Sequence, residues 1–412
     1  MDRARVDVLI VGGGPAGLSA ARALGEAGAT ALVVEKDPRI GEEVRTSGGT
    51  WIRDMVEHGI SADLYHPFRR VRLVTAGSET TFEHREASAC VLDVRRTYRS
   101  LASRSVQAGA SVRTGTTFQS LSIGKDRVSE VVLRDASGRT QKVRAEVVVD
   151  ASGYAATPSR RFGVPTGFRQ FGLGVEEELE APAYDQEEAV LILGREFAPD
   201  GYAWAFPCGR GRVRVGVGVS LPAPGPQPAE LLRRLLSESA HLRASLEGAR
   251  RVEVHRGIVP FSAPTGPLVW NGLVRVGDAA GQVSALAGEG IRLALDAGSM
   301  AGRAVARALE DGGAESPYLR EYERSWRRSQ GRELRAAYQV HRRLLGQTDA
   351  DWERLGRALS PLPAEHIDRL LRSRYSAGWL MRVLVRSPRT IRVGIGLLRS
   401  RPSSGREGSV SP

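Results

Sequence analysis

The amino-acid sequence predicts an α/β protein with an α+β second domain and a helical C-terminal region. Three observations predict this class. An apolar segment at 6–11 runs directly into a glycine-rich turn and then a helical pattern, which is typical of a buried parallel strand and its crossover. Alternating segments between 165 and 222 are typical of antiparallel strands. From about 315 onward the chain has helical periodicity and is rich in arginine.

The segment VDVLIVGGGPAG at 6–17 has the spacing of a dinucleotide-binding fingerprint. Gly12 allows the tight turn, Gly14 lets the backbone approach a pyrophosphate, and Gly17 lets the helix lie close to the strand. A second apolar strand ends at Glu35, where a carboxylate accepts hydrogen bonds from ribose hydroxyls and repels a 2′-phosphate. The alternative is a glycine turn in a non-binding α/β protein, but the whole strand–turn–helix–strand context favours a Rossmann-type dinucleotide site.

Composition narrows the class of partner. The 412 residues include 59 Lys and Arg against 47 Asp and Glu, a net charge of +12. No run interleaves arginine with aromatic residues, so we expect no nucleic-acid partner; an anionic membrane surface or an acidic redox partner fits better. The two cysteines, Cys90 and Cys208, give no disulfide framework and no metal-ligand spacing. Without a signal peptide or an apolar run of roughly twenty residues, we expect a cytoplasmic protein with an optional peripheral membrane contact.

Between the second strand and residue 110 the pattern predicts three features. Residues 69–84 predict a hairpin that turns at 76–78, and 92–109 predict a helix with Val106 on its apolar face. Arg95 and Arg96 stand at the start of that helix, where a cation is unfavourable, so a phosphate or a carboxylate is expected to hold one of them. The polar loop between 36 and 51 is either a surface turn or a loop beside a ligand.

The remaining order predicts a discontinuous first domain. A β-meander at 111–149 rejoins the parallel sheet and ends at Asp150, the position where α/β sheets place ligand contacts. A later strand ends at Gly277-Asp278 and leads into a long helix. The predicted divisions are a nucleotide-binding domain at 1–165 and 265–314, a substrate-binding sheet domain at 166–264, a helical region at 315–400 and a disordered tail at 401–412.

Together these segments resemble the flavin-dependent oxidoreductases of the glutathione-reductase-like superfamily, in the branch with the p-hydroxybenzoate hydroxylase fold, over roughly residues 1–310. The resemblance implies that Glu35 binds the adenosine ribose of FAD and Asp278 its ribitol chain. It implies that Arg95 lies near the pyrophosphate or the flavin ring. Gly288-Glu289-Gly290 then place a helix N-terminus at the pyrimidine edge, where the reduced flavin is negatively charged.

The cofactor-binding residues expected from the fingerprint and this resemblance are Gly12, Gly14, Pro15, Ala16, Gly17, Glu35, Lys36, Arg45, Ser47, Gly48, Arg95, Asp150, Gly153, Gly277, Asp278, Gly288, Gly290 and Ile291. No metal ligand is expected. Only one dinucleotide fingerprint is present. The electron donor is therefore expected to bind transiently, and NADPH, a ferredoxin and a deazaflavin all remain open.

The segment PDGYAWAFPCGRGRVRVGVG is similar to the Y-x-W-x-F-P motif and following G-x-G of the geranylgeranyl reductase family. The six matching residues, expected to bind substrate, are Tyr202, Trp204, Phe206, Pro207, Gly216 and Gly218. On a strand the three aromatic residues share one face and would form a wall for a long hydrocarbon chain; ordinary core packing is the alternative. The chain lacks the cysteine that many members carry in the loop at 44–49.

The predicted function is therefore an FAD-dependent reductase that saturates C=C bonds of a geranylgeranyl-type isoprenoid. Tyr202 and a water molecule are the candidate proton donors. The alternatives are a flavin monooxygenase acting on an aromatic or polyketide substrate and a quinone-linked electron-transfer flavoprotein. The segment at 376–398 predicts either an amphipathic membrane-surface helix or a helix packed on its own domain. The oligomeric state is left open.

Overall fold

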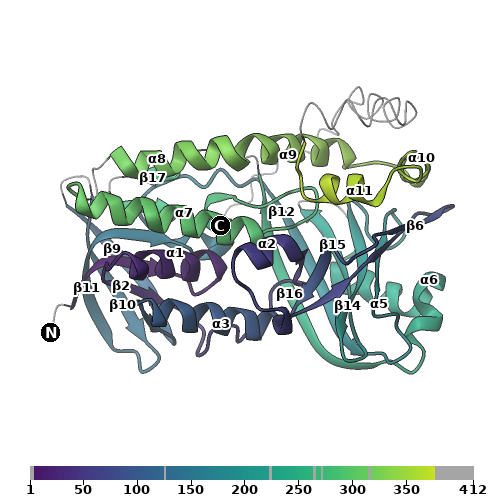
Figure 1. The fold of residues 1–412 in the computed structure, drawn as a ribbon, viewed down its shortest axis with the longest axis horizontal. Helices are drawn as coiled ribbons and strands as arrows, with labels where there is room; N and C mark the ends of the chain where they lie inside the picture. The colour runs from purple at the N-terminus through teal and green to yellow at the C-terminus, as the bar shows by residue number, and fades with distance from the viewer. Residues whose placement is uncertain are drawn as a thin grey trace.

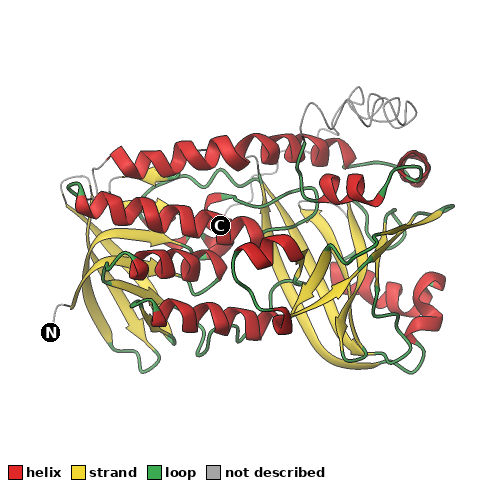
Figure 2. Cartoon of the chain, in the orientation of Figure 1, coloured by secondary structure: helices red, strands yellow, loops and turns green. Residues whose placement is uncertain are grey.

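The computed structural model describes residues 4–124, 127–221, 225–262, 266–270, 272–313 and 317–375. Two sheets lie toward opposite ends of an elongated molecule, and long helices run lengthwise along it (Figure 1). The secondary-structure view shows strands gathered at both ends and helices layered over the first sheet (Figure 2). This mixed α/β architecture with C-terminal helices confirms the predicted fold class.

The first sheet has a parallel core. Its central strand β1 pairs in parallel with β2 on one side and β11 on the other, and β11 also pairs in parallel with β18. The antiparallel β9, β10 and β11 form the predicted meander, and the last of them continues without a break into the parallel sheet. Its strands are β1 (Ala4–Val11), β2 (Ala31–Val34), β8 (Ser111–Arg113), β9 (Thr116–Gly124), β10 (Arg127–Asp135), β11 (Thr140–Asp150), β17 (Val269–Trp270) and β18 (Leu273–Arg275).

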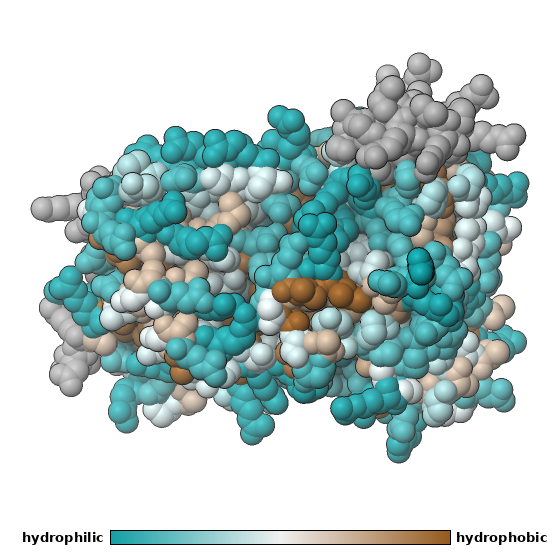
Figure 3. Space-filling model, in the orientation of Figure 1, coloured by the Kyte–Doolittle hydropathy of each residue, from teal (hydrophilic) through white to brown (hydrophobic). Residues whose placement is uncertain are grey.

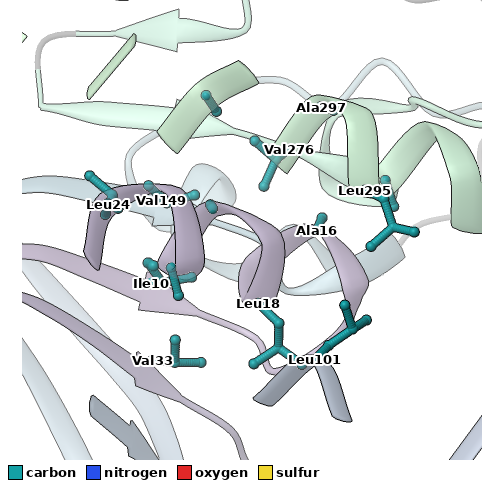
Figure 4. Close-up of a cluster of buried hydrophobic side chains, with 14 of the residues drawn as sticks. Ile10, Ala16, Leu18, Leu24, Val33, Leu101, Val149, Val276, Leu295 and Ala297 are labelled. Carbon is teal, nitrogen blue, oxygen red and sulfur yellow. The ribbon is translucent and has the colours of Figure 1, made fainter. Parts of the chain in front are cut away.

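Helices α1 (Pro15–Glu26), α3 (Val94–Gln107) and α7 (Ile291–Glu310) pack over this sheet. Figure 4 shows Ile10, Leu18, Val149 and Ala297 in one apolar cluster between strands and helices. Helix α7 can approach α1 closely because Gly298 has no side chain. A β-carbon there would lie only 2.1 Å from the carbonyl oxygen of Ala16. The predicted face of α3 was wrong at one position, since Val106 is 53% exposed.

The second sheet has the strand order β16-β12-β15-β14-β13-β5-β6. The predicted hairpin at 69–84 is confirmed as β5 and β6, but it joins this sheet through parallel pairing of β5 with β13. The second sheet therefore includes strands from before residue 165, the predicted boundary between the two domains. The domain division itself remains a prediction. The strands are β5 (Arg70–Val74), β6 (Glu79–Glu83), β12 (Gln170–Glu180), β13 (Glu188–Ile192), β14 (Gly201–Gly209), β15 (Arg212–Leu221) and β16 (Arg250–Phe261).

A small sheet of β3 (Gly49–Trp51), β4 (Tyr65–Phe68) and β7 (Ala89–Leu92) is a further element. The other helices are α2 (Ile52–Glu57), α4 (Thr157–Arg161), α5 (Pro228–Glu238), α6 (Ala240–Arg243), α8 (Pro317–Trp326), α9 (Arg332–Leu344), α10 (Asp349–Leu359) and α11 (Ala364–Leu371). Within the described residues, none of the helices is long and apolar enough to cross a membrane. The predicted amphipathic segment at 376–398 and the predicted disordered tail lie outside the described residues.

Candidate active site

In the glycine loop between β1 and α1, two glycines pack directly against protein backbone and a third has free space beside it. A β-carbon at Gly12, whose φ is +115°, would lie 2.2 Å from the carbonyl oxygen of Ala151. One at Gly17 would lie 2.0 Å from the carbonyl oxygen of Gly12. Neither position tolerates a side chain. At Gly14, in contrast, no protein atom lies within 4 Å of that point, so the backbone is accessible to a phosphate group at the start of α1.

Glu35, at the end of β2, has a fixed carboxylate. One oxygen accepts a hydrogen bond from the backbone N–H of Gly13 at 2.7 Å, and the other accepts one from that of Asp37 at 3.0 Å. These bonds hold the carboxylate beside the glycine loop, where it was predicted to meet a ribose. Two neighbouring predicted residues face outward: the side chain of Lys36 is 63% exposed, and Arg45 forms ion pairs with Asp37 and Glu43.

Asp278 lies where the glycine loop meets the start of α7. A β-carbon at Gly277 would approach the Ala16 side chain at 2.9 Å, and one at Gly290, the N-cap of α7, would lie 3.6 Å from Oδ1 of Asp278. Among the described residues, none donates a hydrogen bond to this carboxylate, and burial raises the pKa of Asp278 to about 6. A half-buried carboxylate without a partner is costly, and a ligand hydroxyl would satisfy it.

These features together fit FAD. The open backbone at Gly14 matches the pyrophosphate, Glu35 the adenosine ribose and Asp278 the ribitol hydroxyls. The N-terminus of α7 at Gly290 and Ile291 would supply positive potential to the pyrimidine edge of a reduced flavin.

Asp150 has a different set of partners from the predicted ligand contact. It is fully buried, and its carboxylate accepts hydrogen bonds from the backbone N–H and hydroxyl of both Ser152 and Ser159. The residue therefore fixes the loop that follows β11. That loop includes Ala151, which lies against Gly12, and Gly153, whose φ of +70° continues the turn. Asp150 acts on the nucleotide site through this loop.

Arg95 is held by a carboxylate, one of its two predicted partners. Its guanidinium forms a salt bridge with Glu253 of β16, with Nη1 to Oε2 at 2.7 Å, and also donates to the carbonyl of Glu42. The hydrogen bonds from Arg95 lower the pKa of Glu253 to about 2. Arg95 thereby joins α3 to the second sheet, and its contact with a pyrophosphate remains a prediction.

The loop at 45–49 lies across the second sheet. Its Ser47 carbonyl accepts a hydrogen bond from Arg214 of β15 at 2.8 Å. A β-carbon at Gly49 would lie 3.2 Å from the ring of Phe206, and one at Gly48, with φ +78°, would lie 3.0 Å from the carbonyl oxygen of Leu92. This part of the polar loop, predicted either as a surface turn or as a loop beside a ligand, therefore packs between the aromatic strand β14 and β7.

The predicted aromatic wall is present on β14. The rings of Tyr202 and Trp204 are 5.6 Å apart, and those of Trp204 and Phe206 are stacked at 6.1 Å. Gly216 and Gly218 of β15 lie beneath the indole, since β-carbons there would approach it at 2.3 and 3.2 Å. The absence of side chains at these two glycines leaves room for the indole of Trp204, which explains why the motif has glycine at both positions.

Pro207 is an exception to the predicted set. It alternates along β14 with the three aromatic residues and therefore lies on the opposite face of the sheet, together with the buried Ala203 and Ala205. Its contribution is to the strand and its core side, rather than to the wall.

The Tyr202 hydroxyl connects the wall to the nucleotide site. It donates a hydrogen bond to the carbonyl oxygen of Ala287 at 2.7 Å, immediately before Gly288 in the loop that leads to α7. Burial, with a further contribution from Glu176, raises the pKa of Tyr202 to about 12. The aromatic wall and the loop predicted to contact the flavin are therefore in direct contact.

A cluster of buried charged residues beside the wall was not predicted. Glu176, Glu178, Arg214 and His255 are each less than 10% exposed and lie on the same face of the second sheet as Trp204. The alternating acids of GVEEELE in β12 were the available signal. That pattern normally indicates a solvated strand face, but here the loop at 45–49 lies over the face and buries it.

Comparisons with known proteins agree with this geometry. The model of the family described as "Lycopene cyclase protein" matches residues 7–393. The chain is 31% identical to digeranylgeranylglycerophospholipid reductase 2 of Methanothermobacter thermautotrophicus, covering 94% of this chain and 98% of that protein. It is 32% identical to digeranylgeranylglycerophospholipid reductase of Methanosarcina acetivorans, covering 92% and 96%.

A solved structure shows the same fold. A geranylgeranyl bacteriochlorophyll reductase-like protein from Thermoplasma acidophilum superposes with a TM-score of 0.85 at 23% identity, covering 96% of this chain and all of that one. The chain therefore belongs to the family of digeranylgeranylglycerophospholipid reductases, within the geranylgeranyl reductases that its motifs resemble, and is an FAD-dependent oxidoreductase.

Proposed function

We propose that this protein saturates C=C bonds in the isoprenoid chain of a lipid. The observation that carries the proposal is the contact between the aromatic wall and the flavin-side loop through Tyr202 and Ala287. A hydrocarbon chain lying against the wall would therefore reach the flavin site. When bound and reduced, FAD supplies the hydride.

The residues of the chain supply position and exclude water. Trp204 is 7% exposed and its N–H is bonded to Glu176, so the stacked rings of Trp204 and Phe206 would present only apolar ring atoms to an alkene held in near-attack geometry. Tyr202 was the predicted catalytic residue. Because its hydroxyl is a weak acid and already donates to Ala287, the geometry supports a role in positioning the loop.

For the cofactor, we propose that Glu35 holds the adenosine ribose, the Gly14 backbone the pyrophosphate and Asp278 the ribitol chain. The start of α7 stabilises negative charge on the flavin. The electron donor is proposed to bind transiently, as the single dinucleotide fingerprint indicates, and NADPH, a ferredoxin and a deazaflavin are distinguished by testing each as reductant.

A peripheral membrane contact is supported by an arginine face on α8 and α9. Exposed arginines recur at intervals of three or four residues, at Arg320 and Arg324 of α8, Arg328 of the π-helical turn that follows it, and Arg332 and Arg335 of α9. The inner face, with Leu319, Tyr322, Trp326 and Leu334, is buried. The upper edge of the molecule, along α8 and α9, is hydrophilic in Figure 3. Such a face favours electrostatic attachment to anionic lipid without insertion.

Vesicle co-sedimentation tests this contact. We expect binding to anionic phospholipid vesicles, little to zwitterionic ones, and loss of binding when Arg324, Arg328 and Arg332 are all replaced by Glu. The matched control replaces three exposed arginines elsewhere, at Arg195, Arg233 and Arg243. Equal loss in both triple variants would indicate a general charge effect and remove the specific contact.

Product analysis tests the reaction. The purified protein, with its flavin reduced chemically and oxygen excluded, is incubated with a geranylgeranyl lipid. We expect products heavier by one H₂ for each bond reduced. A product that forms only with oxygen and contains an added oxygen atom would favour the monooxygenase. Flavin reoxidation by a quinone alone, with the isoprenoid unchanged, would favour the electron-transfer flavoprotein.

A further inference from the structure

A row of side chains crosses four adjacent strands of the second sheet. His255 of β16 is paired with Glu176 of β12, Glu176 with Gly216 of β15, and Gly216 with Trp204 of β14. Because Gly216 has no side chain, the indole crosses β15 and its Nε1 donates to Oε2 of Glu176 at 3.0 Å. The other oxygen, Oε1, lies 2.8 Å from Nδ1 of His255. Glu176 and His255 are each only 3% exposed.

The outer end of the row is accessible to water. Nε2 of His255 lies 3.3 Å from Oε2 of Glu253, within ion-pair range although outside hydrogen-bond geometry. The side chain of Glu253 is 35% exposed, and Arg95 holds its pKa at about 2, so it stays ionised. Both imidazole nitrogens therefore face carboxylates. An ionised carboxylate only accepts hydrogen bonds, so the imidazole is the member of the pair that donates toward Glu176.

The whole row, from β16 to β14, lies under the loop at 45–49. The carbonyl oxygen of Arg45 is so close to Gly257, two residues beyond His255, that a β-carbon there would lie 2.2 Å away. Arg214 donates to the Ser47 carbonyl, and Phe206 lies against Gly49. The pair is thus buried between the sheet and the loop expected beside the flavin ring.

Neighbouring titratable groups are poor proton donors at neutral pH. Burial raises the pKa of both Tyr202 and Cys208 to about 12. Arg214 forms its salt bridge with Glu178 at 3.1 Å, while Glu176 is hydrogen-bonded to Trp204 and His255. The charged and titratable groups around the pair are Glu178 on β12, Arg214 on β15, Tyr202 and Cys208 on β14, Glu253 on β16 and Arg95 on α3.

We propose that Glu176 and His255 together are the proton source for alkene reduction. This inference rests on the proposed function. In each reduction the π bond breaks and two C–H bonds form, one with the hydride that reduced flavin supplies and one with the proton held by the pair. The alkene gains two electrons, the flavin loses two, and the pair recovers its proton from water past Glu253.

Single-turnover reduction of a geranylgeranyl lipid by the chemically reduced holoenzyme tests the proposal. We expect His255→Gln and Glu176→Gln to retain flavin and lipid affinity and to lower the rate by about 100-fold or more, the usual range for general acid catalysis. The solvent deuterium isotope effect should change, and added imidazole should restore part of the rate of His255→Gln. The matched control is His341→Gln, because that buried histidine lies outside the row and burial lowers its pKa to about 4.

Wild-type protein provides the second measurement if a variant does not fold. Its single-turnover rate should fall as pH rises, as expected for a step that needs a protonated general acid. A flat profile, or variants with the wild-type rate and pH dependence, would overturn the proposal while leaving the reductase function intact. If wild-type protein reduces no isoprenoid at any pH, the proposed function fails and this inference fails with it.

Discussion

The glycine loop after β1 and the β14–β15 hairpin both require glycine, but for different neighbours. At Gly12 and Gly17 a side chain would collide with backbone oxygens of the protein itself. At Gly216 and Gly218 it would collide with the indole of Trp204. The first region therefore uses glycine to shape a loop that leaves Gly14 open to a ligand. The second uses glycine to seat an aromatic side chain of the wall.

The comparison predicts that substitutions in the loop have the larger effect. Gly12→Ala and Gly17→Ala place a methyl group against backbone that cannot move, at Gly12 also with a strained φ. We expect little soluble protein and at least tenfold less bound flavin, measured from the ratio of flavin to protein absorbance.

Gly14→Ala is the control, because its β-carbon meets no protein atom. Its apoprotein should unfold at the wild-type temperature, while its affinity for FAD falls. If Gly14→Ala also destabilised the apoprotein, the distinction between closed and open glycines would be lost.

Gly216→Ala should have the next largest effect. Its methyl group would displace the indole and destabilise the fold by about 1–3 kcal/mol, the usual range for overpacking, and we expect kcat/KM to fall with it. Chemical denaturation and steady-state kinetics measure the two effects. Gly218→Ala, with a gap of 3.2 Å against 2.3 Å, should cost less.

A double variant sharpens this point. Adding Trp204→Phe to Gly216→Ala should restore part of the stability, because the smaller ring leaves room for the methyl group. Additive losses would show that Gly216 is required for another reason.

Asp278 should have an effect on stability that is opposite in sign and depends on pH. Its pKa of about 6 exceeds the ordinary value, so between about pH 4 and 6 the folded apoprotein holds a proton that the unfolded chain has lost. Its contribution to stability is therefore most favourable at low pH and declines as pH rises through 6. We expect apo Asp278→Asn to be more stable than wild type at pH 7 by about 1–3 kcal/mol and equal to it near pH 4.

Calorimetry of both apoproteins across pH measures this difference. FAD should stabilise wild type more than Asp278→Asn if the carboxylate binds the ribitol. An equal difference at all pH values would contradict the burial of an ionisable Asp278.

Sequence reasoning predicted the regions that local patterns specify. The glycine loop, Glu35 and the alternation of the aromatic strand all follow from spacing within one segment, and the role of Asp278 follows from the family resemblance. The structure adds what depends on pairing between distant segments. The hairpin β5–β6 joins the second sheet because β5 pairs with β13, more than one hundred residues later. No local pattern encodes that register.

The same reason explains why the buried charged cluster beside the wall was not predicted. His255 and Glu176 are separated by 79 positions and meet only because β12 and β16 pair. Pro207 was expected to bind substrate because it belongs to the matched motif. The alternation of side chains along β14 places it on the opposite, core-facing side of the sheet. Asp150 has the predicted location, and serines of its own loop occupy its carboxylate.

The most direct test of the central claim is anaerobic stopped-flow mixing of the chemically reduced holoenzyme with a geranylgeranyl lipid. The account predicts that flavin absorbance returns without oxygen, at a rate that depends on the lipid, and that the recovered lipid carries one added H₂ for each flavin reoxidised. A flavin that stays reduced in the presence of the lipid, and is reoxidised only when oxygen enters, would contradict it.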